Sequence, residues 1–166
     1  MMASSELESL YQEIILEAAK ERHGYTSGIA GSSTADAAAV AHAQNANHCG
    51  TSHQFNPTCG DELTLLVELS DDHTRIATIA WDGQGCSISQ ASVSLMTDLL
   101  TGKTLAEAHE MIDEFRTVMR SRGTLELDVE KFDDATALSG TSRFLARVKC
   151  AMLGWVALEE ALLKLS

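Results

Sequence analysis

The feature that most constrains the fold of this sequence is a pair of alternating segments joined by a short polar turn. Apolar and polar residues alternate over residues 62–69, and the alternation resumes from Arg75 to Trp81 after the turn Asp71-Asp72-His73. A period of two residues places the apolar side chains on one face of a strand, so these segments predict a β-hairpin. Because a lone hairpin is rarely stable in water, we expect a third strand around residues 52–55.

Helical periodicity flanks the predicted hairpin on both sides. Predicted helices run from about Ser5 to Arg22, from Ile88 to a stop at Gly102, from Thr104 to a stop before Gly123, and from about Ser142 through Leu162. Two of the starts, Ser5 with Glu8 and Thr104 with Glu107, match the capping-box pattern. Between the last two helices, residues 125–134 carry five acidic residues and one Lys. We interpret this stretch as a solvated connector.

Residues 23–55 form an atypical segment that is rich in Gly, Ser and Ala. Asp36 is its only formally charged residue. We interpret the segment as a loop or insertion, in which the Ala-rich residues 36–46 are expected to form a short helix.

Length and charge limit the class of protein. The 166 residues correspond to one ordinary domain, expected to span residues 1–166. The net charge of −12 repels a phosphate backbone, which argues against nucleic acid as a partner. The longest apolar run, residues 37–41, is far shorter than the roughly 20 residues that a membrane span needs. The N-terminal residues lack the basic and apolar regions of a secretory signal, so a cytoplasmic location is expected.

The four cysteines are the residues most able to carry chemistry. They are too few for a disulfide scaffold, and spaced thiols in a reducing compartment more often bind metal or act in catalysis. Cys59 lies in the turn sequence Asn-Pro-Thr-Cys-Gly-Asp at residues 56–61. When Gly60 bends the chain, the Cys59 thiolate and the Asp61 carboxylate can face one divalent ion, and zinc accepts both ligand types. By itself, the hexapeptide favours a plain turn.

Cys86 and Cys150 occupy special positions on predicted helices. Cys86 follows Gly85 and opens a helix, where free N–H groups and the helix dipole favour a thiolate. An equal alternative is that Ser87 or Ser89 caps the helix while Cys86 only packs. Cys150 lies about 160–200° from the main apolar stripe of its helix, on a face of small residues. This position favours close packing against another helix.

Taken together, three segments resemble the IscU/SufU family of iron–sulfur cluster assembly proteins. They are the turn at residues 56–61, the segment Asp-Gly-Gln-Gly-Cys-Ser-Ile-Ser at 82–89 with its continuation to Met96, and the segment Ala-Arg-Val-Lys-Cys-Ala-Met-Leu-Gly-Trp at 146–155. The resemblance is closer to the SufU branch for two reasons. An additional segment around residues 128–144 precedes the last Cys, and Lys149 stands where the scaffold branch has His.

The resemblance implies an α+β fold in which a small three-stranded antiparallel sheet is covered by helices. It also implies a zinc ion held by Cys59, Asp61, Cys86 and Cys150. Three thiolates and a carboxylate outweigh Zn²⁺ by two charges, which Lys149, Arg147 or Arg143 can offset. SufU-type proteins are zinc-dependent sulfurtransferases that accept sulfur from a PLP-dependent cysteine desulfurase of the SufS type. The acceptor thiol implied here is Cys59, with Lys149 in a supporting role, and a downstream iron–sulfur scaffold is a further possible partner.

Two other functions are compatible with the same residues. The first is a scaffold that holds a [2Fe–2S] cluster, although Lys149 would have to be desolvated and deprotonated to act as a ligand. The second is a purely structural zinc domain, although such sites are usually closed by four strong Cys or His ligands.

The chain departs from the family pattern between His23 and Phe55. Cys49 is an additional cysteine, and His48-Cys49 with His53 has the look of a metal cluster. We nevertheless expect Cys49 to be a loop thiol without a structural role. The remaining histidines are expected to be solvated; they are His23, His42, His73 and His109.

Overall fold

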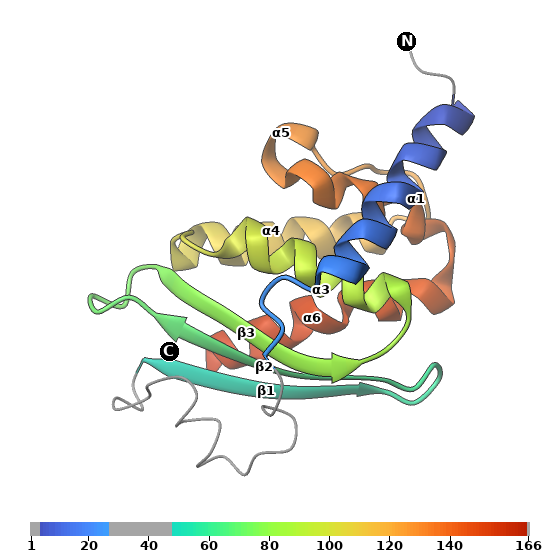
Figure 1. Cartoon of the computed structure of the whole chain (residues 1–166). Coiled ribbons are helices and arrows are strands. Elements are labelled where there is room, and N and C mark those ends of the chain that lie inside the picture. Colours follow the sequence, from blue (N-terminus) through green and yellow to red (C-terminus); the bar gives the residue numbers. More distant parts are fainter. Residues whose placement is uncertain (1–3, 27–47, 166) are drawn as a thin grey trace.

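The computed structural model describes residues 4–26 and 48–165 (Figure 1). The elements are α1 (Ser4–Glu21), β1 (Cys49–Asn56), β2 (Asp61–Leu69), β3 (Ile76–Gln84), α3 (Ser87–Leu100), α4 (Leu105–Met119), α5 (Val129–Phe132), the 3₁₀ helix η1 (Asp133–Arg143) and α6 (Leu145–Leu163). The helix expected over residues 36–46 lies outside the described residues. Of the helices described, none combines the length and apolarity that crossing a membrane requires.

The three strands form one antiparallel sheet in the order β1-β2-β3. In the centre of the sheet, Leu65 pairs with Ser52 on β1 and with Trp81 on β3. The predicted hairpin is therefore confirmed, and the third strand extends beyond the expected residues 52–55. Helices α1, α3, α4 and α6 gather on one side of the sheet, so the predicted α+β architecture is confirmed as well (Figure 1).

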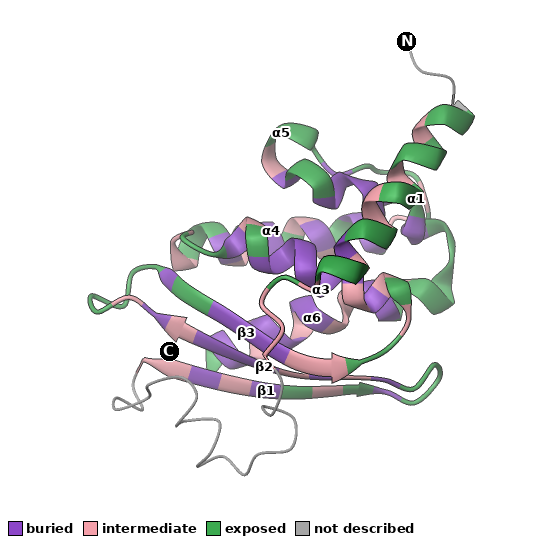
Figure 2. Ribbon diagram, in the orientation of Figure 1, coloured by how far each residue is buried: buried purple, intermediate pink, exposed green. Residues whose placement is uncertain are grey.

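The hydrophobic core fills the space between the sheet and these helices (Figure 2). The alternating residues of β2 that face it are buried, as the two-residue period predicts; they are Leu63, Leu65, Val67 and Leu69. From the helices, Phe115 and Trp155 stack in the core with ring centroids 4.0 Å apart. A smaller cluster of Leu66, Ala80 and Cys49 lies apart from this core.

Helices α3 and α6 approach each other closely. Cys86 lies at the start of α3, and Cys150 lies on α6. A side chain in place of the Gly154 hydrogen would lie 2.9 Å from Val93 Cβ. The Ser92 hydroxyl donates to the Ala151 carbonyl at 2.6 Å and accepts from Trp155 Nε1 at 3.0 Å. Because these buried polar groups satisfy one another, they fix the position of α6, and hence of Cys150, relative to α3.

The segment predicted as a solvated connector is in part a core element, so that prediction is wrong. Leu127 and Phe132 are buried, and the Phe132 ring lies 6.3 Å from Trp155. The exposed acids Glu126, Asp128 and Glu130 accompany them, which explains why the segment has no clear apolar period. The short helix α5 and the 3₁₀ helix η1 follow, so that α6 begins at Leu145 and not near Ser142.

The two predicted capping boxes have different outcomes. At α4, the Thr104 hydroxyl accepts from the Glu107 N–H at 3.2 Å, and the Glu107 carboxylate accepts from the Thr104 N–H at 3.1 Å. This capping box is confirmed. At the first helix, Ser5 is the second residue of α1 and therefore not its N-cap, so that prediction is wrong.

Candidate metal centre

The turn between β1 and β2 holds Cys59 beside a buried asparagine. Asn56 Oδ1 accepts from the Thr58 N–H at 3.1 Å, and the Gly60 N–H donates to the Asn56 carbonyl at 2.8 Å. Gly60 has a φ of +72°, a left-handed conformation that costs glycine little. The Asn56 amide also donates to Cys59 Sγ at 2.9 Å. Cys59 is thus exposed in a turn that is organised around it.

Asp61, the first residue of β2, is fully buried. Its Oδ1 accepts from the Cys86 N–H at 2.8 Å, and its Oδ2 lies 3.1 Å from Cys59 Sγ. A side chain at Gly85 would lie 2.4 Å from Asp61 Oδ1, so glycine is what allows this close approach. The carboxylate therefore joins the β1–β2 turn to the start of α3.

Cys86 is the N-cap residue of α3, as the sequence predicts. Its side chain makes no capping hydrogen bond, and its Sγ lies 3.8 Å from Asp61 Oδ2. The Ser89 hydroxyl donates to the Cys86 carbonyl at 3.0 Å, so it does not act as the cap. The thiol of Cys86 is thus left at the edge of the site, half-buried, with its backbone N–H committed to Asp61.

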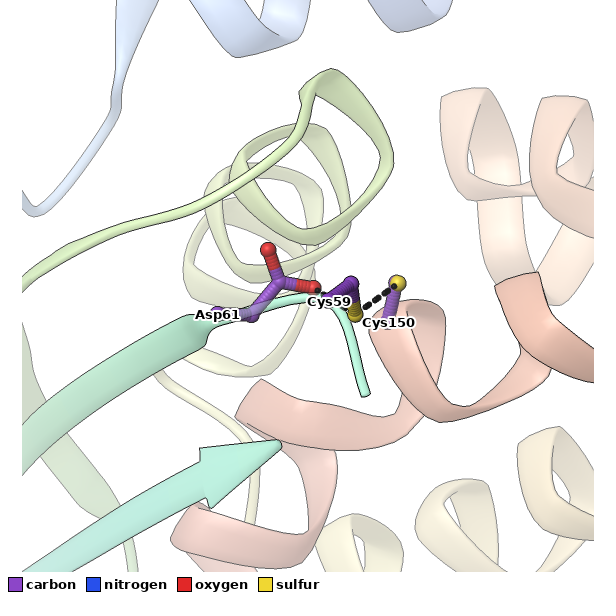
Figure 3. A group of neighbouring side chains, drawn as sticks. All are labelled: Cys59, Asp61 and Cys150. Atoms are coloured by element: carbon purple, nitrogen blue, oxygen red, sulfur yellow. Dashed lines mark hydrogen bonds between the residues drawn. The ribbon is translucent and has the colours of Figure 1, made fainter. Parts of the chain in front are cut away.

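Cys150 reaches the same place from α6. It is buried, and its Sγ lies 3.1 Å from Cys59 Sγ although 91 residues separate the two in sequence. Figure 3 shows Asp61 at the start of β2 and Cys150 on α6, with Cys59 between them. The unusual face of α6 that carries Cys150 therefore packs toward a cysteine and a carboxylate.

Three of the four expected ligands form a group that could hold a metal ion. One ligand atom each from Cys59, Asp61 and Cys150 lies within 4.8 Å of the other two. Cys86 is adjacent but does not belong to this group. Two thiol sulfurs with a carboxylate oxygen are a donor set that zinc accepts, so the residues present fit this metal.

The electrostatics of the group also favour a cation. Burial acts to raise the pKa of Asp61, but hydrogen bonds from Cys150, Cys59 and Cys86 outweigh it and lower that pKa. Burial, together with the hydrogen bonds to Asp61 and Cys59, raises the pKa of Cys150. The carboxylate is therefore ionised beside a neutral thiol, and a bound cation is what would make the thiolate favourable.

The basic residues proposed to offset the site's charge lie around it in different ways. Lys149 is exposed and lines a cavity of about 300 Å³ with residues 54–58 of the β1–β2 region and with Met152, Leu153 and Val156 of α6. Arg143 is directed toward α1, with its Nη1 3.8 Å from Glu8 Oε1. Arg147 is exposed on the first turn of α6.

The histidines near Cys49 do not gather around it. His53 bonds Thr64 Oγ1 at 2.8 Å and lies 3.1 Å from Glu62 Oε1, whereas Cys49 packs with Leu66 and Ala80. The pattern His48-Cys49 with His53 is therefore not a ligand cluster. Cys49 belongs to β1 rather than to a loop, and burial, with a smaller contribution from the Glu68 charge, raises the pKa of its thiol.

Asn56 is the functional residue that sequence reasoning missed. In the sequence it is only the first residue of the turn, but in the structure it supports both the turn backbone and the Cys59 sulfur. The sequence does contain a signal for this role. In turns, the side chain of an Asn commonly accepts a hydrogen bond from the backbone N–H two residues later.

Comparisons with known proteins identify the family of this chain. Residues 35–151 match the family described as the NifU-like N terminal domain. The chain is 34% identical over 163 residues to the iron–sulfur cluster assembly scaffold protein IscU of Streptococcus pyogenes serotype M1, which covers 97% of this chain and 87% of the relative. It is 42% identical over 109 residues to the zinc-dependent sulfurtransferase SufU of Bacillus subtilis, covering 66% of this chain and 71% of the relative.

A solved structure extends the likeness over nearly the whole chain. The SUF-system iron–sulfur cluster assembly scaffold protein of Fervidobacterium islandicum AW-1 superposes with a TM-score of 0.68 at 28% identity, covering 93% of this chain and 98% of that one. Together with the matched family region and the two relatives, this structural likeness supports one family assignment by sequence and by fold. The chain therefore belongs to the family of the NifU-like N-terminal domain, alongside IscU and SufU proteins.

Proposed function

We propose that this chain is a zinc-dependent sulfurtransferase of the SufU branch, which accepts persulfide sulfur from a PLP-dependent cysteine desulfurase of the SufS type for iron–sulfur cluster assembly. One observation carries the proposal: an exposed Cys59 thiol contacts a buried carboxylate and a buried thiol. An acceptor thiol has to be reached by a partner protein, whereas the groups that hold it in place do not. The Bacillus subtilis relative, a zinc-dependent sulfurtransferase, supports the same assignment.

The ligands that would hold zinc are Cys59, Asp61, Cys86 and Cys150. Cys59, Asp61 and Cys150 already lie together, and Cys86 Sγ lies 3.8 Å from Asp61 Oδ2. When bound, zinc supplies positive charge that keeps its thiol ligands deprotonated. This property suits a site whose proposed reaction begins with a thiolate.

The proposed transfer conserves atoms and electrons. The Cys59 thiolate attacks the terminal sulfur of the desulfurase's cysteine persulfide, forming a new S–S bond on Cys59. The S–S bond in the desulfurase breaks, and its cysteine leaves as a thiolate. One persulfide is consumed for each persulfide formed, so no external oxidant or reductant is needed. The sulfur then passes to a downstream iron–sulfur scaffold.

Cys59 is better suited to this role than Cys86 or Cys150. The Cys150 side chain is buried on α6, and the Cys86 backbone is tied to Asp61 at the start of α3. Cys59 lies two residues after Pro57 and directly before Gly60, whose backbone is left-handed. A Cβ atom added at Gly60 would meet no other atom within 4 Å. The turn therefore has space to present the Cys59 sulfur to a partner while the other ligands stay in place.

Mass spectrometry after a single turnover tests the proposal directly. The protein is mixed with desulfurase and cysteine under non-reducing conditions, alkylated, and digested into peptides that separate the four cysteines. We expect one added sulfur on the peptide that contains Cys59. Sulfur found only on Cys49, Cys86 or Cys150 would show that the acceptor has been assigned wrongly.

A scaffold that holds a [2Fe–2S] cluster is the second candidate. The Streptococcus pyogenes relative and the Fervidobacterium islandicum structure are both named as iron–sulfur cluster assembly scaffold proteins, and thiolates also bind iron–sulfur clusters. The composition of the site favours transfer over this alternative. Lys149 precedes Cys150 at the position where the scaffold branch has His, and a lysine ammonium group, unlike a neutral imidazole, offers no lone pair to a metal.

Lys149→Ala is expected to lower the rate of sulfur acceptance by up to about fivefold without loss of zinc, because an exposed charge contributes at most roughly 1 kcal/mol. Lys149→Arg should restore the rate by keeping the charge. Lys164→Ala, which removes a positive charge from the C-terminal end of α6, is the matched control and should leave the rate unchanged. Initial rates at several salt concentrations measure the effect; equal losses in Lys149→Ala and Lys149→Arg would rule out a role for the charge.

The proposed partners and location follow from the same properties. The four cysteines are free thiols, which persist in a reducing compartment, and this supports a cytoplasmic location. The net charge of −12 supports a protein partner over nucleic acid.

A further inference from the structure

Two histidines meet at the end of the sheet remote from Cys59. His48 immediately precedes β1, and His73 lies in the turn between β2 and β3. Their Nε2 atoms are 2.9 Å apart, and their rings meet edge to face with centroids separated by 4.0 Å and planes inclined at 76°. The Nε2 atoms, which ligate metals in many proteins, therefore lie within hydrogen-bond distance of each other here.

This pair is separate from the cysteine centre. Asp61 begins β2 and Leu69 ends it, and the Leu69 N–H donates to the His48 carbonyl at 2.7 Å. At a rise of roughly 3.3 Å per residue, the length of β2 puts about 25 Å between the two sites. A ligand at the histidines would therefore not contact Cys59, Asp61 or Cys150.

The turn that carries His73 is held by its own hydrogen bonds. Asp72 Oδ1 accepts from the Ser70 hydroxyl at 2.7 Å and from the Thr74 hydroxyl and N–H at 2.7 and 3.1 Å. These bonds lower the pKa of Asp72 to about 2, so a negative charge stays next to His73 in sequence. His73 itself adopts a left-handed backbone with a φ of 60°, and its N–H donates to the Ser70 carbonyl at 2.8 Å. The ring of His73 is thus presented from an organised turn.

We propose that His48 and His73 form a second metal site, which binds a divalent transition-metal ion such as Zn²⁺ through both Nε2 atoms, with water completing the coordination. Imidazole nitrogen suits Zn²⁺, Cu²⁺ and Ni²⁺. Tetrahedral Zn–N bonds of roughly 2.0–2.1 Å would place the two nitrogens about 3.3 Å apart. The observed Nε2–Nε2 distance of 2.9 Å is within a few tenths of an ångström of that spacing. The rings meet edge to face with centroids 4.0 Å apart, so binding requires both side chains to rotate until each Nε2 faces the ion.

The site would connect two parts of the chain that are distant in sequence. His48 and His73 are 25 residues apart, one at the start of an edge strand and the other in the β2–β3 turn. A metal bound by both would stabilise the start of β1 against the turn, since an ion that binds only the folded arrangement stabilises it. This role is independent of sulfur transfer at Cys59.

Zinc titration of the tag-free, zinc-loaded full-length protein tests the proposal. Isothermal titration calorimetry should show a second equivalent of Zn²⁺, weaker than the first. Loss of even an outer partner of a metal ligand costs roughly 10–100-fold in affinity, so His48→Ala and His73→Ala should each weaken the second event at least about tenfold. His53→Ala is the matched control, because His53 is also a half-exposed histidine of the same sheet. It should leave the second event unchanged.

Histidine proton signals in NMR spectra give a second readout that does not depend on heat. Added Zn²⁺ should shift the ring signals that disappear in His48→Ala and in His73→Ala, and should leave those of His53 in place. If no second equivalent binds, the two rings form only a hydrogen bond and the proposal fails. It also fails if His53→Ala weakens the second event as much as the other two variants do.

Discussion

Cys59→Ser is expected to abolish the stimulation of a SufS-type desulfurase by this protein. A serine hydroxyl replaces sulfur by oxygen at nearly the same position, but it is not a nucleophile toward a persulfide at neutral pH. The proposed chemistry provides no second route, since the neighbouring Cys150 thiol is buried. Desulfurase turnover, measured as alanine formed per minute from cysteine, should therefore fall to the rate of the desulfurase alone.

Cys49→Ser is the matched control for this experiment. It makes the same atomic change in a cysteine on β1, away from the Cys59–Asp61–Cys150 group. Stimulation should persist in Cys49→Ser, and both variants should retain the circular dichroism spectrum of the unmodified protein. If Cys59→Ser still stimulated the desulfurase fully, Cys59 could not be the sulfur acceptor, whether or not the metal site stayed intact.

The sheet and most of the helices could be predicted because their signals are local. Alternation over residues 62–69 decides which side chains of β2 face the core, and the structure buries Leu63, Leu65, Val67 and Leu69 as that pattern requires. The capping box of Thr104 and Glu107 likewise involves residues three apart. In such cases, the partners that fix the structure are contained in one short stretch of sequence.

The region before α6 could not be predicted from the same kind of signal. Residues 125–143 combine acidic residues at the surface with Leu127, Phe132 and Leu138 in the core. A 3₁₀ helix has three residues per turn, so its buried positions do not follow the α-helical period. What orders this segment is its contact with distant residues, such as that of Phe132 with Trp155.

The candidate site shows the same division between local and long-range information. The family resemblance implies metal ligands at residues 59, 61, 86 and 150, and the structure brings three of them into one group. The bond from the Cys86 N–H to Asp61 could not be foreseen, because it joins residues 25 apart through the packing of α3 on the sheet. The same is true of the contact between His48 and His73, which are 25 residues apart and share no local pattern.

Metal analysis is the second experiment with a large expected effect. Protein purified without chelators and dialysed against metal-free buffer should contain about one zinc per chain, bound at the cysteine centre. Asp61→Ala, Cys86→Ala and Cys150→Ala should each lose it, as should Cys59→Ala, while Cys49→Ala should keep it. Iron with labile sulfide in place of zinc, in protein purified in air, would instead favour the scaffold function.

Removal of this zinc should also destabilise the fold, because its ligands come from the β1–β2 turn, the start of β2, the start of α3 and α6. Free zinc at about 1,000 times its Kd contributes about 4 kcal/mol to the folded state. For a domain of this size, that energy corresponds to a fall in Tm of roughly 8–16 °C on chelation. Calorimetry before and after treatment with a chelator measures the change, and readdition of zinc should reverse it. A melting curve that stays the same after verified zinc loss would mean that the four ligands do not bind one ion jointly, because an ion that bridges these segments must stabilise their folded arrangement.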